Sequence, residues 1–268
     1  MSLLSVTGLT RRFAGLVAVD EIDLTVAAGG VHAIIGPNGA GKTTLFNLLS
    51  GLVKPSAGRV SFEDADITAL SPAARARAGV VRTFQNIRVF ASMTVLENVL
   101  TGLHVRTAAG LLSVLSRGPG FRAEERTAVA RARAALDFVG LADSADRRAG
   151  ALSYGDQRRL EIARAVVSQP RLLLLDEPAA GMNPAETEQL AVLVRRLREQ
   201  GTTVLLVEHD MGFVMDISDH VTVLNFGRRI ADGTPVSVRR DPAVIEAYLG
   251  HKVAARLEAG ARSGVRGA

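Results

Sequence analysis

The amino-acid sequence predicts an α/β protein built on a mostly parallel sheet. Short apolar runs alternate with amphipathic stretches along most of the chain, which is the pattern of strands that alternate with helices. A length of 268 residues allows one large domain, or a domain with an inserted subdomain, and leaves ample material for a core.

Strand patterns dominate the chain up to about residue 84. Residues 1–30 are expected to form short antiparallel strands joined by turns. The segments with strand patterns are Leu3–Leu9, Glu21–Val26, Val31–Ile35, Arg59–Phe62 and Gly79–Phe84. One helix is expected among these strands, beginning at Thr44 and running to Leu49.

Between about Asn86 and Gly150 the sequence consists mainly of helix-forming residues and has few strand patterns. Within Glu124–Val139 the apolar residues fall on one helical face; they are Val129, Ala132, Leu136 and Val139. Thr107–Phe121 is rich in glycine and contains a proline, so it is expected to be a flexible connection. Strand and helix patterns alternate again from Leu152 to about Leu249.

These segments predict one domain over residues 1–250, with a helical subdomain at 86–150 inserted in the core. Residues 251–268 consist mainly of Ala, Gly and Arg without apolar periodicity, so we expect a disordered tail there. No cysteine is present, which excludes disulfides and thiol-ligated metals and suits a reducing cytosol. No signal-peptide pattern opens the chain, and no apolar run approaches the roughly 20 residues of a membrane span. We expect a soluble protein that can dock on a membrane protein.

The net charge of +5 is compatible with a nucleic acid or an anionic membrane as partner. However, the arginines are scattered beside Glu and Asp, and aromatic residues, which stack on bases, make up only 4% of the chain. Solvated helix faces therefore explain the charge better, and no nucleic-acid partner is expected.

The segment that follows Val31–Ile35 fits the phosphate-loop pattern G-x-x-x-x-G-K-[ST]. Its glycines allow successive backbone N–H groups to surround the α- and β-phosphates of a nucleotide. Lys42 can reach the β- and γ-oxygens, and the Thr43 hydroxyl can hold Mg²⁺. A chance match is the alternative, but a strand before the loop and a helix after it argue against chance. The expected ATP-contacting residues here are Gly36, Pro37, Asn38, Gly39, Ala40, Gly41, Lys42, Thr43 and Thr44.

Four consecutive leucines lead into two carboxylates, Asp176 and Glu177. A buried strand with this sequence would place Asp176 beside Mg²⁺ and Glu177 beside the γ-phosphate. Glu177 would then polarise the attacking water as a general base. The alternative is a core strand that ends in a solvated acidic turn, and the phosphate loop in the same chain favours the catalytic interpretation.

Two further segments are ambiguous on their own. Ser153 and Gly155 precede the helix expected at Arg158–Val167, so they form either an anion-binding helix end or, as we would favour from this stretch alone, an ordinary Ser cap. His209 follows the strand expected at Thr203–Val207, where a lone histidine is usually a surface or satisfied core residue. A metal site at His209 is improbable because no cysteine or second histidine lies near it in sequence.

The order and spacing of these motifs over residues 3–250 resemble the ATP-binding-cassette (ABC) ATPases. The resemblance implies that Phe13 stacks on adenine and that Gln85 touches Mg²⁺ or water. It also implies that Asp176 binds Mg²⁺, that Glu177 is the catalytic glutamate and that His209 contacts the γ-phosphate. Ser153 and Gly155 would close over ATP held by a second ATPase subunit, so the working unit would be a head-to-tail dimer.

Three residues depart from the pattern of the wider family: Tyr154 replaces glycine, Asp156 replaces a common glutamine, and Asn183 stands where many relatives have aspartate. Tyr154 and Asn183 are ordinary in one subfamily, the ATPase subunits of branched-chain, or hydrophobic, amino acid importers. The stretches similar to that subfamily are Thr83–Phe90, Met93–Val99, Tyr154–Arg164, Pro178–Pro184 and Glu246–Gly250.

The resemblance implies ATP and Mg²⁺ as ligands and a second ATPase subunit, identical or related, as partner. It also implies two transmembrane permease subunits, a substrate-binding protein that delivers the substrate, and a peripheral place at the cytoplasmic face of the membrane. Arg88, Val89, Phe90 and Thr107–Phe121 are the expected docking elements, with plain packing inside the subdomain as an equal alternative. An importer of urea or short amides, or a lipopolysaccharide exporter, would keep every catalytic residue. An ABC protein that acts on ribosomes or DNA, or a phosphate-loop kinase, fits this single cassette less well.

Overall fold

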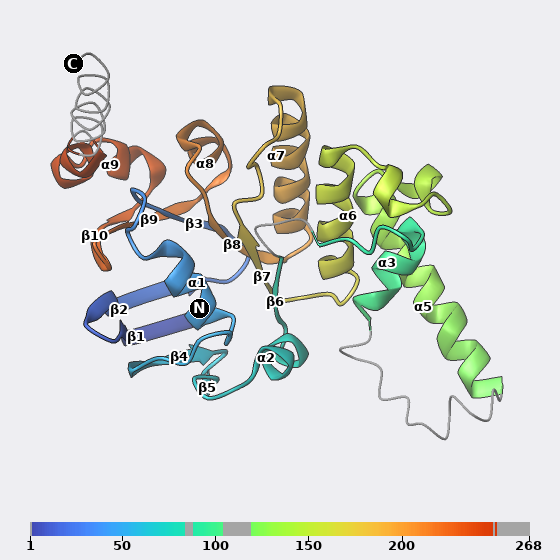
Figure 1. Cartoon of the computed structure of the whole chain (residues 1–268), viewed down its shortest axis with the longest axis horizontal. Helices are drawn as coiled ribbons and strands as arrows, with labels where there is room; N and C mark the ends of the chain where they lie inside the picture. The colour runs from blue at the N-terminus through green and yellow to red at the C-terminus, as the bar shows by residue number, and fades with distance from the viewer. Residues whose placement is uncertain (1, 84–87, 104–118, 249, 251–268) are drawn as a thin grey trace, which may run out of the picture. The chain divides into compact units, whose positions relative to one another are not determined.

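The computed structural model describes residues 2–83, 88–103, 119–248 and 250. The chain divides into two compact units, one formed by residues 1–69 with 205–268 and the other by residues 70–204. Figure 1 shows the elements of both along the chain. The expected domain over 1–250 and the inserted subdomain at 86–150 stay predictions, and the expected tail at 251–268 lies outside the described residues.

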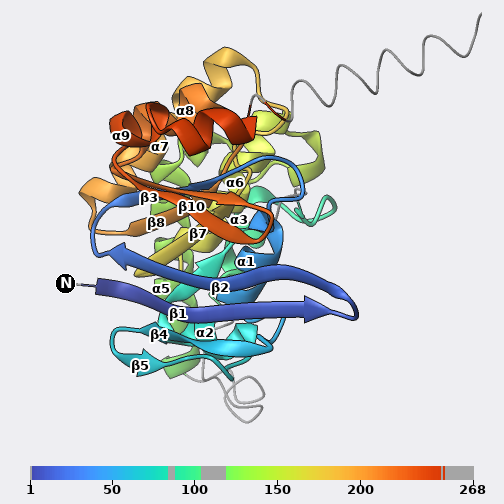
Figure 2. The ribbon, with the colours of Figure 1, turned by 90° about the vertical axis from the view of Figure 1, so that its left-hand side faces the viewer.

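The first unit contains an antiparallel four-stranded sheet in the order β2-β1-β4-β5. Its strands are β1 (Ser2–Phe13), β2 (Leu16–Ala27), β4 (Ala57–Phe62) and β5 (Ala65–Asp66), which run side by side in Figure 2. The expected antiparallel start of the chain is therefore confirmed. Both of its first two strands are longer than predicted, because they continue into a partly exposed hairpin in which Phe13 pairs with Leu16.

The same unit contains a second group of strands, one of which, β3 (Val31–Ile35), leads into the phosphate loop. They lie in the order β10-β9-β3-β8, where β3 pairs in parallel with β9 (His220–Asn225), and β10 (Arg228–Gly233) pairs antiparallel with β9. Strands β3 and β8 (Thr203–Val207) are buried over all five of their residues, which explains why their sequences are apolar apart from His32 and Thr203. Helices of this unit include α1 (Lys42–Leu49), α8 (Met211–Ile217) and α9 (Pro235–Arg239), and residues 242–248 are also helical.

The second unit combines a parallel strand pair with helices. Strand β6 (Val80–Arg82) pairs in parallel with β7 (Leu172–Asp176). The helices are α2 (Pro72–Ala78), α3 (Val95–Thr101), α5 (Pro119–Phe138), α6 (Tyr154–Val166) and α7 (Pro184–Glu199), with single 3₁₀ turns η1 (Ala142–Ser144) and η2 (Ala149–Ala151). Helices α3, α5 and α6 pack against one another, and Ala132 and Leu136 of α5 are fully buried, as their spacing predicts.

Two helices of the second unit begin earlier than predicted. The flexible connection was expected to reach Phe121, but α5 begins at Pro119, since proline suits the first turn of a helix, where its missing N–H has no intrahelical partner. Residues 107–118 of that connection lie outside the described residues. Helix α6 begins at Tyr154 rather than Arg158. Within the described residues, no helix combines the length and apolar character needed to cross a bilayer.

Candidate functional site

The phosphate loop connects the end of β3 to the start of α1 in the first unit, as predicted. Gly36 has a φ of 151°, and a Cβ placed on it would lie 2.2 Å from the carbonyl oxygen of Leu224. Gly41 has a φ of 97°, and its Cβ would lie 2.4 Å from the carbonyl oxygen of Ala18. Only glycine tolerates such contacts with backbone, so the loop conformation that exposes its N–H groups depends on these two residues.

Lys42 is the first residue of α1 and its ammonium is held inside the loop. Its Nζ donates hydrogen bonds to the carbonyl oxygens of Gly36 at 2.6 Å and Pro37 at 2.9 Å, and the residue is only 8% exposed. A buried ammonium beside exposed Asn38 and Gly39 gives the loop a fixed positive charge that suits an anionic phosphate. Among the other predicted ligands, Thr43 is exposed, Thr44 is half-buried and Ala40 is buried.

Phe13 ends β1 at the tip of the hairpin and is 41% exposed. The guanidinium carbon of Arg11 lies 4.5 Å from the centre of its ring, which is a cation–π contact. An exposed ring of this kind can stack on a planar base. The structure therefore leaves Phe13 available for the predicted adenine contact.

His209 lies just after β8, at a strand end that is next to the phosphate loop. The backbone N–H of Glu208 donates to the carbonyl oxygen of Ile34 at 3.4 Å, two residues before the loop begins. Glu208 is fully buried, and its Oε2 accepts the backbone N–H of His209 at 2.9 Å. The same oxygen lies 3.7 Å from Nδ1 of His209, whose side chain is 60% exposed. The prediction missed Glu208, a carboxylate that fixes the position of His209.

Asp176 ends strand β7 in the second unit and Glu177 follows it, as predicted. Asp176 is 2% exposed, and its Oδ2 accepts a hydrogen bond from Nη2 of Arg82 at 2.6 Å. Glu177 is half-buried and has a left-handed backbone with a φ of 46°. Non-glycine residues in this conformation are strained and concentrate at functional sites. The ion pair with Arg82 was not predicted, because it joins two strands that are 94 residues apart.

Ser153 caps helix α6 by accepting the backbone N–H of Asp156 at 3.1 Å. Its ordinary capping role and the anion-binding interpretation are compatible, because a side-chain cap satisfies only one of the orphan backbone N–H groups at the start of a helix. Gly155 is buried, and a Cβ there would lie 2.6 Å from Glu186, whose carboxylate is held by the backbone N–H of Asn183.

The departures from the wider family pattern have structural roles in the second unit. The Tyr154 hydroxyl donates to the carbonyl oxygen of Ala180 at 3.0 Å, which ties the start of α6 to the segment after Glu177. Asn183 caps α7 in a reciprocal capping box. Asp156 forms an ion pair with Arg159 one turn along α6. Gln85, expected to touch Mg²⁺ or water, lies outside the described residues.

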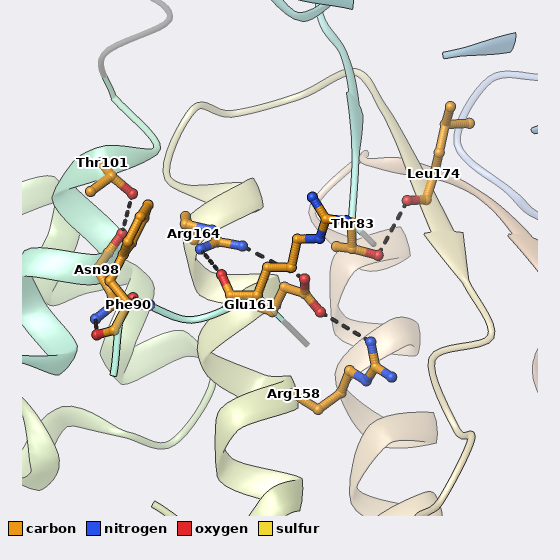
Figure 3. Close-up of polar contacts among 9 residues, drawn as sticks. Thr83, Phe90, Asn98, Thr101, Arg158, Glu161, Arg164 and Leu174 are labelled. Carbon is orange, nitrogen blue, oxygen red and sulfur yellow. Dashed lines mark hydrogen bonds and ion pairs between the residues drawn. The ribbon is translucent and has the colours of Figure 1, made fainter. Parts of the chain in front are cut away.

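A groove of about 400 Å³ lies in the second unit between β6, α3 and α6. Figure 3 shows the polar contacts that shape it. Asn98 holds Phe90 by accepting its backbone N–H at 2.8 Å and donating to its carbonyl oxygen at 3.1 Å. Arg164 donates to the carbonyl oxygen of Arg88 at 2.5 Å, and burial lowers its pKa below the ordinary value for arginine. Phe90 itself remains 49% exposed on the groove.

Ion pairs along α6 stabilise one wall of the groove. Glu161 is 1% exposed and accepts a hydrogen bond from Arg158 at 3.0 Å, and its other oxygen lies 3.6 Å from Arg164. These pairs fix the α6 wall of the groove. The groove therefore presents a half-exposed aromatic ring and held arginines on a rigid base.

A strand, a glycine loop and a helix in the first unit, with a strand ending in two carboxylates in the second, define a P-loop nucleoside triphosphatase. Comparison with known proteins narrows this class. The family model for ABC transporters matches residues 19–180, and a model described as a branched-chain amino acid ATP-binding cassette transporter matches residues 228–254. The chain belongs to the ABC transporter family, as an ATP-binding subunit with ATPase activity.

Individual relatives are similar over nearly their whole length. The high-affinity branched-chain amino acid transport ATP-binding protein BraF of Pseudomonas aeruginosa is 51% identical, over 92% of this chain and 98% of that protein. The corresponding protein LivG of Escherichia coli is 50% identical with the same coverage. Among solved structures, a nucleotide-free ATP-binding cassette matches with a TM-score of 0.81 and 36% identity, over 92% of this chain and 99% of that one. The ADP conformation of another cassette matches with a TM-score of 0.82 and 37% identity, over 93% and 99%.

Proposed function

We propose that this chain is the ATP-hydrolysing subunit of an ABC importer for branched-chain amino acids. The ATPase activity in this proposal rests on the Lys42 ammonium, which is buried inside the phosphate loop. Two glycines of that loop leave no room for a side chain. The transport proteins that are about 50% identical over 92% of the chain support the substrate class. The amino acid itself would be bound by other subunits of the complex.

Different residues have different roles in ATP hydrolysis. The loop N–H groups and Lys42 bind the phosphates, and Glu177 orients and deprotonates the attacking water as a general base. His209, positioned by buried Glu208, contacts the γ-phosphate. The Thr43 hydroxyl and the Asp176 carboxylate are hard oxygen ligands that suit Mg²⁺. When bound, Mg²⁺ neutralises charge on the β- and γ-phosphate oxygens.

A second ATPase subunit would complete the site. Ser153 and its neighbours stand at an exposed helix end, where backbone N–H groups and the helix dipole favour a phosphate. We propose that this end of α6 closes over ATP bound by the other subunit, which is either a copy of this chain or a related ATPase. ATP would close the pair and hydrolysis would reopen it.

The groove with Phe90 on its surface is the proposed docking site for a cytoplasmic helix of a permease subunit. An exposed aromatic ring on a rigid base is a typical anchor for a partner helix. The complex would contain two permease subunits, would receive substrate from a binding protein, and would hold this chain at the cytoplasmic face of the membrane. No nucleic acid is needed in this scheme.

The proposal is tested by rebuilding the transporter in vesicles. The chain, its partner ATPase and the permease subunits are reconstituted in proteoliposomes, and uptake of labelled leucine is measured with binding protein and ATP. We expect ATP-dependent uptake with the natural chain and none with Glu177→Gln. Uptake of urea or short amides instead of leucine would contradict the substrate class.

The docking site is tested separately with a matched pair of variants. Phe90→Ala removes an exposed aromatic ring that lines the groove, whereas Met93→Ala removes an exposed apolar side chain near it in sequence that does not. We expect co-purification with the permease to fall at least about tenfold for Phe90→Ala and to stay unchanged for Met93→Ala. Equal behaviour of the two variants would contradict the proposed docking site.

A further inference from the structure

Two histidines and an aspartate from three neighbouring strands of the first unit lie together on one sheet face. His32 of β3 is the direct cross-strand partner of His220 of β9. Thr222 lies two residues further along β9, on the same face, and its cross-strand partner on β10 is Asp232. The strand register thus gathers residues that are up to 200 positions apart in sequence. None of them belongs to the ATPase motifs.

The polar atoms of this cluster converge on one point. Nε2 of His220 lies 3.2 Å from Oδ1 of Asp232, and the two imidazole rings have centres 4.8 Å apart. Nε2 of His32 lies 2.8 Å from the Thr222 hydroxyl, which donates to the same Asp232 oxygen at 2.5 Å. One ligand atom from each of the three titratable residues lies within 4.8 Å of the others.

We propose that His32, His220 and Asp232 form a binding site for a divalent transition-metal ion, and we take Zn²⁺ as the example because it suits these ligands. Two imidazoles and one carboxylate are a typical three-residue ligand set for zinc, with a water molecule as the fourth ligand. Nitrogen ligands favour zinc-like ions over Mg²⁺ and Ca²⁺, which take oxygen. This site is independent of the proposed transport function.

One pair of ligand atoms already has the spacing that zinc needs, and the third ligand, from His32, has to move closer, because the three atoms lie within 4.8 Å of one another. Zinc ligands at about 2.0–2.1 Å from the metal lie about 3.3 Å from one another in a tetrahedron, and the His220–Asp232 distance of 3.2 Å already meets this. The Thr222 hydroxyl can keep its hydrogen bond to Asp232, so the carboxylate stays oriented. His32 is 4% exposed, whereas the His220 and Asp232 side chains are 40% and 35% exposed, which leaves an open side for the ion and for water.

The electrostatic environment is mixed. Burial is the main reason that the pKa of His32 is lowered to about 4, so its imidazole is neutral at physiological pH, the form that binds metal. Arg229 opposes a cation, because its guanidinium lies 3.7 Å from the second oxygen of Asp232. Removing this arginine should therefore strengthen metal binding.

A bound ion would connect β3, β9 and β10 at a place remote from the nucleotide. His32 is near the start of β3, and the phosphate loop follows the end of that strand, about 13 Å further along at roughly 3.3 Å per residue. We therefore expect the ion to raise the stability of the first unit without entering the ATPase reaction.

The test is calorimetric titration of the chelator-treated full-length chain with Zn²⁺, with Mg²⁺ and Ca²⁺ as comparison ions. We expect one Zn²⁺ per chain and a rise in Tm of roughly 3–8 °C. His220→Gln and Asp232→Asn, both at partly exposed positions, should weaken binding at least about tenfold, and Arg229→Gln should tighten it. His251→Gln, which removes an imidazole elsewhere in the chain, should change nothing.

Direct evidence comes from Co²⁺, whose visible absorption reports tetrahedral coordination by nitrogen and oxygen. We expect the natural chain to give this spectrum and His220→Gln to lose it while its circular dichroism is unchanged. The proposal is overturned if the natural chain binds no Zn²⁺, or if His220→Gln and Asp232→Asn bind it as tightly as His251→Gln does. In that case the cluster is a hydrogen-bond network that joins the three strands.

Discussion

Arg82 and Asp176 form a buried ion pair at the ends of two parallel strands, with 2.6 Å between the guanidinium nitrogen and the carboxylate oxygen. Their side chains are only 9% and 3% exposed, so water screens this contact weakly. Asp176 is also the carboxylate expected to meet Mg²⁺. Arg82 therefore neutralises and orients the carboxylate that we propose as an Mg²⁺ ligand.

Arg82→Gln should destabilise the chain, because it leaves the Asp176 carboxylate buried without its cation. Removing one partner of a buried ion pair costs about 3–5 kcal/mol, which corresponds to a fall in Tm of roughly 10 °C for a chain of this size. Differential scanning calorimetry of the nucleotide-free protein measures this. Arg77→Gln, on the exposed side of α2, is the control and should shift Tm by less than about 2 °C. Similar shifts for the two variants would show that the ion pair is unimportant.

Lys42→Ala should weaken ATP binding, because it removes the ammonium that the phosphate loop holds. Hydrogen bonds to a charged group are worth about 1.5–3 kcal/mol, so affinity should fall by roughly 10- to 100-fold. Titration with a fluorescent ATP analogue gives the dissociation constants. Lys54→Ala removes an exposed lysine outside the loop and should bind ATP normally. Unchanged affinity in Lys42→Ala would exclude a direct contact with phosphate.

Gly102→Ala should disturb the packing of α3 against α6 beside the docking groove. A Cβ at this position would lie 2.0 Å from the carbonyl oxygen of Arg164 and 2.8 Å from Val167. Overpacking of this kind costs about 1–3 kcal/mol, so Tm should fall by several degrees. Gly15→Ala is the matched control, since nothing lies within 4 Å of its added Cβ. If the two substitutions have the same effect on Tm, the close approach of α3 and α6 is not as described.

The local elements could be predicted from the sequence where burial is complete. Strands Val31–Ile35 and Thr203–Val207 are confirmed residue by residue, because both are mainly apolar and are bounded by polar or glycine residues. The start of α6 was placed four residues late, since Tyr154–Gln157 carries little apolar periodicity and only the Ser153 cap marks the boundary.

Contacts between residues far apart in sequence could not be predicted in this way. Arg82 meets Asp176, and His32 meets His220, through strand pairing between segments about 90 and 190 residues apart. No local pattern encodes such contacts, because they depend on which strands become neighbours. A role for Glu208 could have been predicted from the sequence, because this carboxylate is next to His209. Its complete burial is visible only in the structure.

We expect Glu177 to activate the water that hydrolyses ATP. Glu177→Gln keeps the size and the hydrogen-bonding ability of the side chain but removes the base, so it should still bind ATP. Glu188→Gln, at an exposed position on α7, is the control and should hydrolyse ATP like the natural chain.

The decisive measurement is phosphate release by Glu177→Gln under saturating ATP and Mg²⁺, with the molecular mass followed by light scattering. We expect the rate to fall at least about 100-fold, with ATP retained and a stable dimer of the ATPase subunits formed. Phosphate release at the rate of the natural chain would contradict the assignment of Glu177 as the general base.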